Sequence, residues 1–203
     1  MDLNRTVSKI GVAIVTITVF LFAVFIITGF FAGQYFVCAL LPMGFIMMSA
    51  GFQYESGTDR RVPANVGMIF AAVYAVLVLL VYFSQNAYVS HETLSDQASS
   101  ILLFRPGSLV FCYDLLGYGM MALSTLFTGL SIKPQNKPDK WLKALMIIHG
   151  AFFPGCFIMP MTGIFSGDHS SDGIGGNIAL LFWCVYFIPV GVLAFLHFGK
   201  EKN

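Results

Sequence analysis

Residues 10–53, IGVAIVTITVFLFAVFIITGFFAGQYFVCALLPMGFIMMSAGFQ, contain no Asp, Glu, Lys or Arg. A membrane-spanning helix needs about 20 mostly apolar residues, so this stretch is long enough to cross a bilayer twice. Its main polar break is Ala32-Gly33-Gln34. We therefore expect two helices, residues 10–31 and 35–53, joined as a tight antiparallel hairpin.

Four further apolar windows follow along the chain: residues 63–83, 107–131, 141–165 and 176–198. They lack the two-residue alternation of strands, and an open sheet would leave backbone groups unpaired in lipid. Only 10% of the 203 residues are charged, whereas a soluble domain carries about a quarter. The sequence thus predicts an all-α, polytopic membrane protein with six transmembrane helices in a single domain, residues 1–203.

The basic residues are segregated. Ten of the eleven Lys and Arg lie at the N-terminus, in the second and fourth connections, or at the C-terminus, and only Arg105 lies in an odd-numbered connection. The positive-inside rule then places both termini in the cytoplasm and the chain in the cell membrane. The first apolar run is longer than that of a signal peptide and no A-x-A-like site follows it, so we expect it to be retained. A net charge of +1 makes nucleic acid an unexpected partner.

Two connections have a distinctive composition. In the second, Glu55, Asp59, Arg60 and Arg61 are crowded together, and we expect ion pairs that hold a turn at the headgroups. The third, residues 84–106, is the longest, and its apolar residues recur at helical spacing between polar ones. This pattern predicts a short amphipathic helix on the outer surface, which either caps a cavity or rests on the headgroups.

Asp114 is the only acid well inside a predicted span. A carboxylate in hydrocarbon costs several kcal/mol, so it must face a cavity, find a partner or take up a proton. Residues three and four positions apart share one helix face, which here forms a semi-polar, inward-facing stripe. That stripe consists of Asp114, Gly117, Tyr118, Met121, Thr125 and Thr128. Asp114 is either a proton, cation or ligand acceptor, or a carboxyl bonded to a neighbouring Tyr, Ser or backbone group.

His149 is the corresponding residue of the fifth span. At about 1.5 Å per residue, Asp114 lies roughly 7 Å outside the mid-plane and His149 roughly 6 Å inside it. We therefore expect no direct contact, although water or a ligand would connect them. The alternative is a buried His bonded to a carbonyl group. The predicted ligand-binding residues are Asp114, Tyr118, Met121, His149 and Tyr113.

The outer connections carry residue types that bind cations. His91, Asp168 and His169 are the candidate metal ligands, but their spacing matches no metal motif, and a run such as that from Asp168 to Asp172 is more often a solvated turn. The four cysteines form no C-x-x-C pair, so we interpret them as small apolar fillers. The sequence predicts no cofactor.

Six short-looped helices with both termini inside resemble, in size and topology, the substrate-binding membrane subunits of energy-coupling-factor vitamin transporters. The first span, Ile10-Gly-Val-Ala-Ile-Val-Thr-Ile-Thr-Val, lacks the alanine motif of those subunits. The resemblance therefore implies an architecture suited to binding a small molecule, and does not extend to membership.

Three functional hypotheses follow. The first is a protein that binds or transports a small apolar or cationic molecule through an intramembrane cavity open to the outer face, with Asp114 as its anchor. The second is a non-transporting sensor, immunity or assembly subunit that acts through helix contacts with a membrane partner or a second copy. The third is an enzyme acting on lipid at the outer leaflet through His91, Asp168 and His169. No catalytic residue is predicted, because no hydrolase, zinc-protease or P-loop motif is present.

Overall fold

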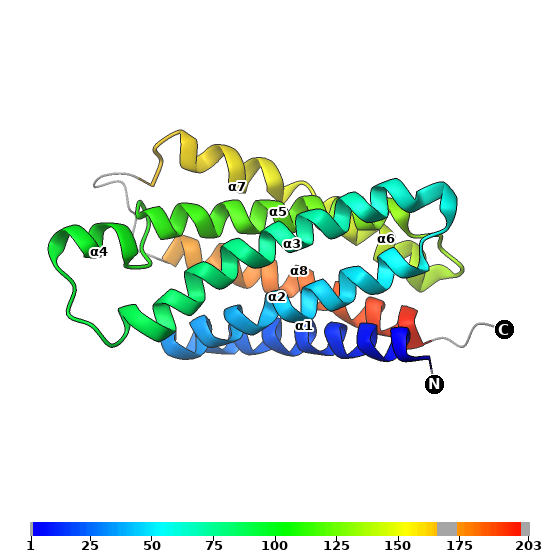
Figure 1. Cartoon of the computed structure of the whole chain (residues 1–203), viewed down its shortest axis with the longest axis horizontal. Coiled ribbons are helices and arrows are strands. Elements are labelled where there is room, and N and C mark those ends of the chain that lie inside the picture. Colours follow the sequence, from blue (N-terminus) through cyan, green and yellow to red (C-terminus); the bar gives the residue numbers. More distant parts are fainter. Residues whose placement is uncertain (1, 166–173, 200–203) are drawn as a thin grey trace.

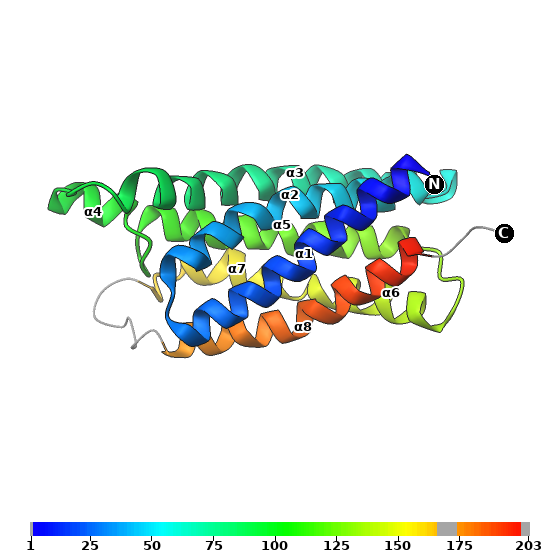
Figure 2. The ribbon, with the colours of Figure 1, turned by 90° about the horizontal axis from the view of Figure 1, so that it is seen from below.

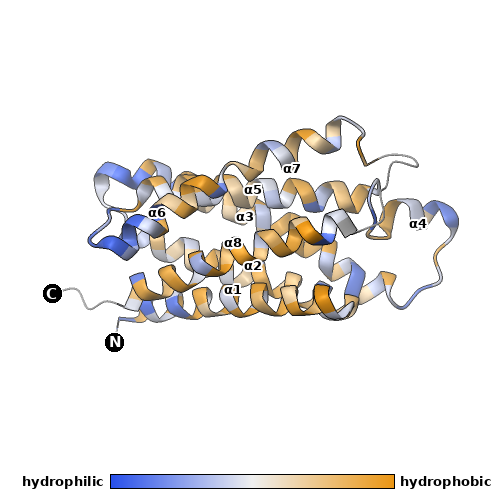
Figure 3. Ribbon diagram, turned by 180° about the vertical axis from the view of Figure 1, so that it is seen from behind, coloured by the Kyte–Doolittle hydropathy of each residue, from blue (hydrophilic) through white to orange (hydrophobic). Residues whose placement is uncertain are grey.

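The computed structural model describes residues 2–165 and 174–199, and these residues form helices without a β-strand (Figure 1). Six helical segments are long and apolar enough to cross a membrane, as the sequence predicts. Large apolar side chains such as Phe20, Phe36 and Phe83 are more than half exposed on the outside of the bundle. An apolar exterior and polar helix ends (Figure 3) indicate a membrane-embedded protein.

The bundle is built mainly from long antiparallel helices. The first four predicted spans correspond to α1 (Leu3–Thr28), α2 (Phe31–Glu55), α3 (Arg61–Ser84) and α5 (Leu109–Ser131). The fifth comprises α6 (Lys137–His149) and α7 (Phe152–Met161), and the sixth is α8 (Ile174–Gly199). Shorter elements lie in the connections: η1 (Thr58–Arg60), the π-helical turn η2 (Gln85–Val89) and α4 (Asp96–Leu102).

The first hairpin turns three residues earlier than predicted. Gly29 ends α1 with a left-handed φ of 68°, a conformation that glycine adopts without strain, and α2 already begins at Phe31. Ala32, Gly33 and Gln34 therefore belong to α2. The Gln34 side-chain amide donates at 3.0 Å to the Phe25 carbonyl, which also accepts from the Phe30 N–H.

The sequence predicted one continuous helix for the fifth span, but the structure has two. The chain breaks at Gly150 and Ala151, between α6 and α7. Pro154 has no N–H to donate, and the break places it in the first turn of α7, where no helical partner is needed. At Gly150 an added Cβ would lie 2.9 Å from the Leu126 Cβ of α5. Glycine therefore permits close approach to α5 at this point.

The long helices form a ring around a core of aliphatic and aromatic side chains. Neighbouring contacts run from α1 to α2, α3 and α5, then through α6 to α8 and back to α1; Figure 2 shows α8 beside α1. The start of α1 and the end of α8 lie at the same end of the bundle (Figure 1). Helix α7 packs chiefly on α5 and has no buried residue. It diverges from the bundle toward the end where α4 lies.

The third connection contains α4, which the Ser95 hydroxyl caps by accepting from the Ala98 N–H at 3.3 Å. Gln85 is 1% exposed. Its side chain donates to the Leu102 carbonyl and accepts from the Phe104 N–H. These bonds attach the end of α4 to α3 and η2. That α4 rests on an outer membrane surface stays a prediction.

Candidate functional site

Asp114 is buried inside the bundle. The Ser108 hydroxyl accepts from the Phe111 N–H at 3.2 Å and starts α5 at Leu109, so Asp114 lies in the second turn. Its exposed fraction is 6%, and its Oδ1 atom has no hydrogen-bond partner among the described residues. A buried acceptor without a partner is rare, because it has lost its water without regaining a bond. Asp114 is therefore the residue around which the candidate site is built.

Four polar side chains from three helices surround this carboxyl. The Tyr82 side chain of α3 interacts with Asp114, and the Tyr118 hydroxyl of α5 donates to Cys38 Sγ of α2 at 3.9 Å. The Tyr74 ring of α3 lies 5.7 Å from the Tyr118 ring. Tyr74 is fully buried, and its hydroxyl also lacks a partner within the described part of the chain. We call these five residues the carboxyl–tyrosine cluster.

An aromatic chain leads from this cluster to His149. The Tyr118 and Trp183 rings are 5.5 Å apart, and the Trp183 indole N–H donates to His149 Nε2 at 2.9 Å. Since Nε2 accepts, the imidazole proton is on Nδ1, which donates to the Thr125 hydroxyl at 2.7 Å. The Thr125 hydroxyl in turn donates to the Ala122 carbonyl. His149 is thus neutral, and both of its nitrogens are bonded.

Asp114 and His149, which both belong to the described part of the chain, share no hydrogen bond or ion pair, in agreement with the separation calculated from their positions in the sequence. Tyr118 and Trp183 lie between them. Met121 is fully buried, on the same face of α5 as Asp114. Tyr113 is 45% exposed and does not join the cluster. The structure therefore brings Asp114 and Tyr118 together, connects His149 to them indirectly and leaves Tyr113 outside.

The metal candidates do not form a site in the part of the chain that the structure describes. His91 is exposed in the connection before α4, and Asp168 and His169 lie outside the described residues. Within residues 2–165 and 174–199, no group of three or more His, Cys, Asp or Glu side chains is placed to hold a metal ion.

Four members of the site were not predicted from the sequence: Tyr74, Tyr82, Trp183 and Cys38, which was interpreted as an apolar filler. Tyr74 and Tyr82 are eight residues apart, which places them on the same face of a helix. Two tyrosines on one face of an apolar span were a usable signal. Trp183 offered none, because its partner His149 is 34 residues away on another helix.

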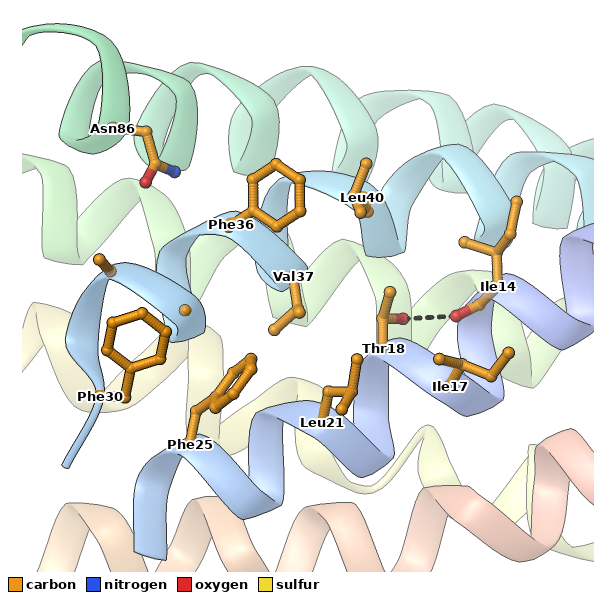
Figure 4. A pocket seen from close by; sticks show the side chains of 12 residues that line it. Ile14, Ile17, Thr18, Leu21, Phe25, Phe30, Phe36, Val37, Leu40 and Asn86 are labelled. Atoms are coloured by element: carbon orange, nitrogen blue, oxygen red, sulfur yellow. Dashed lines mark hydrogen bonds between the residues drawn. The ribbon is translucent and has the colours of Figure 1, made fainter. Parts of the chain in front are cut away.

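A separate apolar groove of about 590 Å³ lies between α1 and α2 (Figure 4). Ile17, Leu21 and Phe25 line it from α1, and Phe36 and Leu40 line it from α2. Asp114 and Tyr118 are not among its lining residues. This groove is therefore not the predicted cavity that leads to Asp114.

No protein-family model matches the chain, and comparisons with curated proteins and with solved structures give no match. We therefore infer the class of ligand from the side chains of the site alone. A buried carboxyl favours a proton or a cation, since a charge in an apolar interior requires a partner. Tyrosine ring faces attract cations, and their hydroxyls donate or accept hydrogen bonds.

Proposed function

We propose that this protein binds or transports a small organic cation inside its helix bundle, with Asp114 as the counter-charge. The observation that supports this most directly is the Oδ1 atom of Asp114, which is buried without a hydrogen-bond partner among the described residues. An ammonium group provides both an opposite charge and hydrogen-bond donors. Either of these would satisfy a carboxylate that the protein leaves incomplete.

The surrounding side chains favour an organic cation over a metal ion. Tyr74, Tyr82 and Tyr118 supply ring faces and hydroxyls, and Cys38 supplies a thiol. A mostly apolar site with a few converging polar groups is typical for small organic ligands. Cation–π attraction to aromatic rings is strongest where the cation is desolvated, as it would be beside Asp114.

We further propose that the ligand arrives from the outer side, beside α7. Asp114 belongs to the first half of α5, in the half of the bundle away from the start of α1 and the end of α8 (Figure 1). The positive-inside rule assigns that half to the outside. Helix α7 covers α5 there, with Cys156 and Phe153 facing Gly119. An element without buried residues is displaced more easily than one with a packed face.

The proposal is tested by thermal unfolding of the purified protein with a series of ammonium compounds, from methylammonium to tetraethylammonium. We expect at least one of them to raise the unfolding temperature. Binding at 100 times Kd stabilises by about 2.7 kcal/mol, which is roughly 5–10 °C for a chain of this length.

The Asp114→Asn variant should lose this response. Asp96→Asn, which removes an exposed acid of α4, is the matched control and should keep it. The proposal is wrong if no compound in the series stabilises the protein, or if Asp114→Asn responds like the original chain.

A further inference from the structure

A second buried ionisable group lies at the opposite end of the bundle from Asp114. His197, near the end of α8, has Nε2 3.2 Å from Glu55 Oε2 and Nδ1 3.0 Å from Asp139 Oδ1. Glu55 is the last residue of α2, and Asp139 lies in the first turn of α6. The three side chains are 13%, 12% and 1% exposed. One imidazole ring therefore connects three helices.

This arrangement determines the protonation state of the ring. An ionised carboxylate only accepts hydrogen bonds, so the imidazole must donate from both nitrogens and carry both protons. Arg5 of α1 donates to Glu55 Oε1 at 3.3 Å. These four side chains comprise two cations and two anions. The Phe52 and Phe198 rings, 5.4 and 5.3 Å from the imidazole ring, do not titrate.

The contact between His197 and Asp139 joins α8 to α6, and we call the line along which these two helices meet the seam. The fifth and sixth spans meet where α6 faces α8, and polar contacts cross there: the Trp183 bond to His149, the Tyr186 hydroxyl bond to the Leu145 carbonyl and the His197 contact with Asp139. The first two join neutral groups. The third needs a proton on Nδ1 of His197, and because Nε2 faces Glu55 at the same time, these two contacts together need an imidazolium.

We propose that His197 is a proton-operated latch that closes this end of the bundle. While the imidazolium is present, it holds α8 to α6 through Asp139 and to α2 through Glu55. When the ring loses a proton, one nitrogen becomes an acceptor that faces a carboxylate oxygen, and that contact turns repulsive. When that nitrogen is Nδ1, the seam between α6 and α8 opens at the end that holds the basic connections; when it is Nε2, the contact between α8 and α2 is lost instead. This latch does not depend on what binds at Asp114.

The test uses Ala194→Cys as a reporter, because Ala194 is fully buried three residues before His197 on the same side of α8. Its labelling by a small maleimide is followed from about pH 5.5 to about pH 9.5, which spans the titration of an ordinary imidazole. The same reporter is placed in a His197→Arg background. Arginine donates to both carboxylates and stays charged throughout this range. The ratio of the two rates cancels the ionisation of the thiol, and the protein without the reporter corrects for the four native cysteines.

We expect a ratio near one at the acidic end. At the alkaline end, the reporter should label several-fold faster in the chain that keeps His197 than in the His197→Arg background. His197→Gln, which carries no charge, should label fast at every pH. A ratio of one across the whole range would show that the network is a fixed structural contact and would overturn the latch. If His197→Gln fails to fold, the labelling rates of the Ala194→Cys reporter with His197 and with His197→Arg are enough to test the latch.

Discussion

Asp114 and Asp139 are both buried acids of the same bundle, but their carboxyl groups differ in their hydrogen bonding. Asp139 is 1% exposed; its Oδ1 faces His197, and its Oδ2 accepts from the Gln135 N–H at 3.0 Å. Asp114 is 6% exposed and has one oxygen without a partner among the described residues. A bundle that can fully pair one acid does not leave another incomplete for want of donors. This difference is what we expect if Asp139 is a structural carboxylate and Asp114 serves the proposed ligand.

The comparison predicts its largest effect at Asp139. Asp139→Ala removes one of the two carboxylates that face the buried His197 imidazolium, while the other, Glu55, also pairs with Arg5. Breaking a buried pair in this way costs about 3–5 kcal/mol. We expect the free energy of unfolding in mixed micelles to fall by that amount, as measured by denaturant titration. Asp59→Ala, which breaks an exposed pair with Lys133, should change it by less than about 1 kcal/mol.

Equal losses from Asp139→Ala and Asp59→Ala would show that the buried network contributes no more than a surface pair. In that case Asp139 could no longer be called a stabilising carboxylate, in contrast to Asp114.

The His197 network also shows where sequence reasoning reaches its limit. The crowded second connection predicted ion pairs among Glu55, Asp59, Arg60 and Arg61. Asp59 does pair with Arg60 and, more closely, with Lys133. Glu55 instead points into the bundle toward Arg5 and His197. His197 is 142 residues from Glu55, and nothing in a local pattern connects two residues so far apart.

Features that depend on neighbouring residues were predictable. The apolar windows predicted the six candidate membrane spans, and the spacing along residues 114–128 predicted the inward stripe of α5, whose Asp114, Thr125 and Thr128 are buried. The helix boundary at Gly150 depends on how α6 ends against α5, whereas the boundary at Gly29 follows from the local left-handed conformation of that glycine. The Trp183 bond to His149 depends on the ring of helices closing, so the sequence alone could not reveal it.

A smaller effect is expected at His149, which, like Asp139, has its hydrogen bonds satisfied. Trp183→Phe keeps a large aromatic ring against Tyr118 but removes the N–H that donates to His149 Nε2. A buried acceptor left without its donor costs about 1–3 kcal/mol. We expect denaturant titration to show a loss in that range. Phe182→Leu, on the 63% exposed neighbouring position, should change stability by less than about 0.5 kcal/mol.

A Trp183→Phe variant as stable as the original chain would mean that the indole N–H is not needed to satisfy His149. That result would contradict the inference that Nε2 of His149 depends on Trp183 for its hydrogen bond.

The smallest effect on stability is expected at Asp114 itself. Asp114→Asn keeps the shape of the side chain and removes its charge. Because Oδ1 makes no hydrogen bond within the described part of the chain, the substitution breaks no contact at that atom, and it removes the penalty of a charge in an apolar interior. We expect the free energy of unfolding to stay within about 0.5 kcal/mol of the original value or to rise, while the response to ammonium compounds disappears. A fall of more than about 2 kcal/mol, comparable to the loss of a buried charged bond, would show that Asp114 holds the bundle together as Asp139 does. A residue that can be neutralised without loss of stability, but not without loss of binding, is one that the fold tolerates for the sake of its ligand.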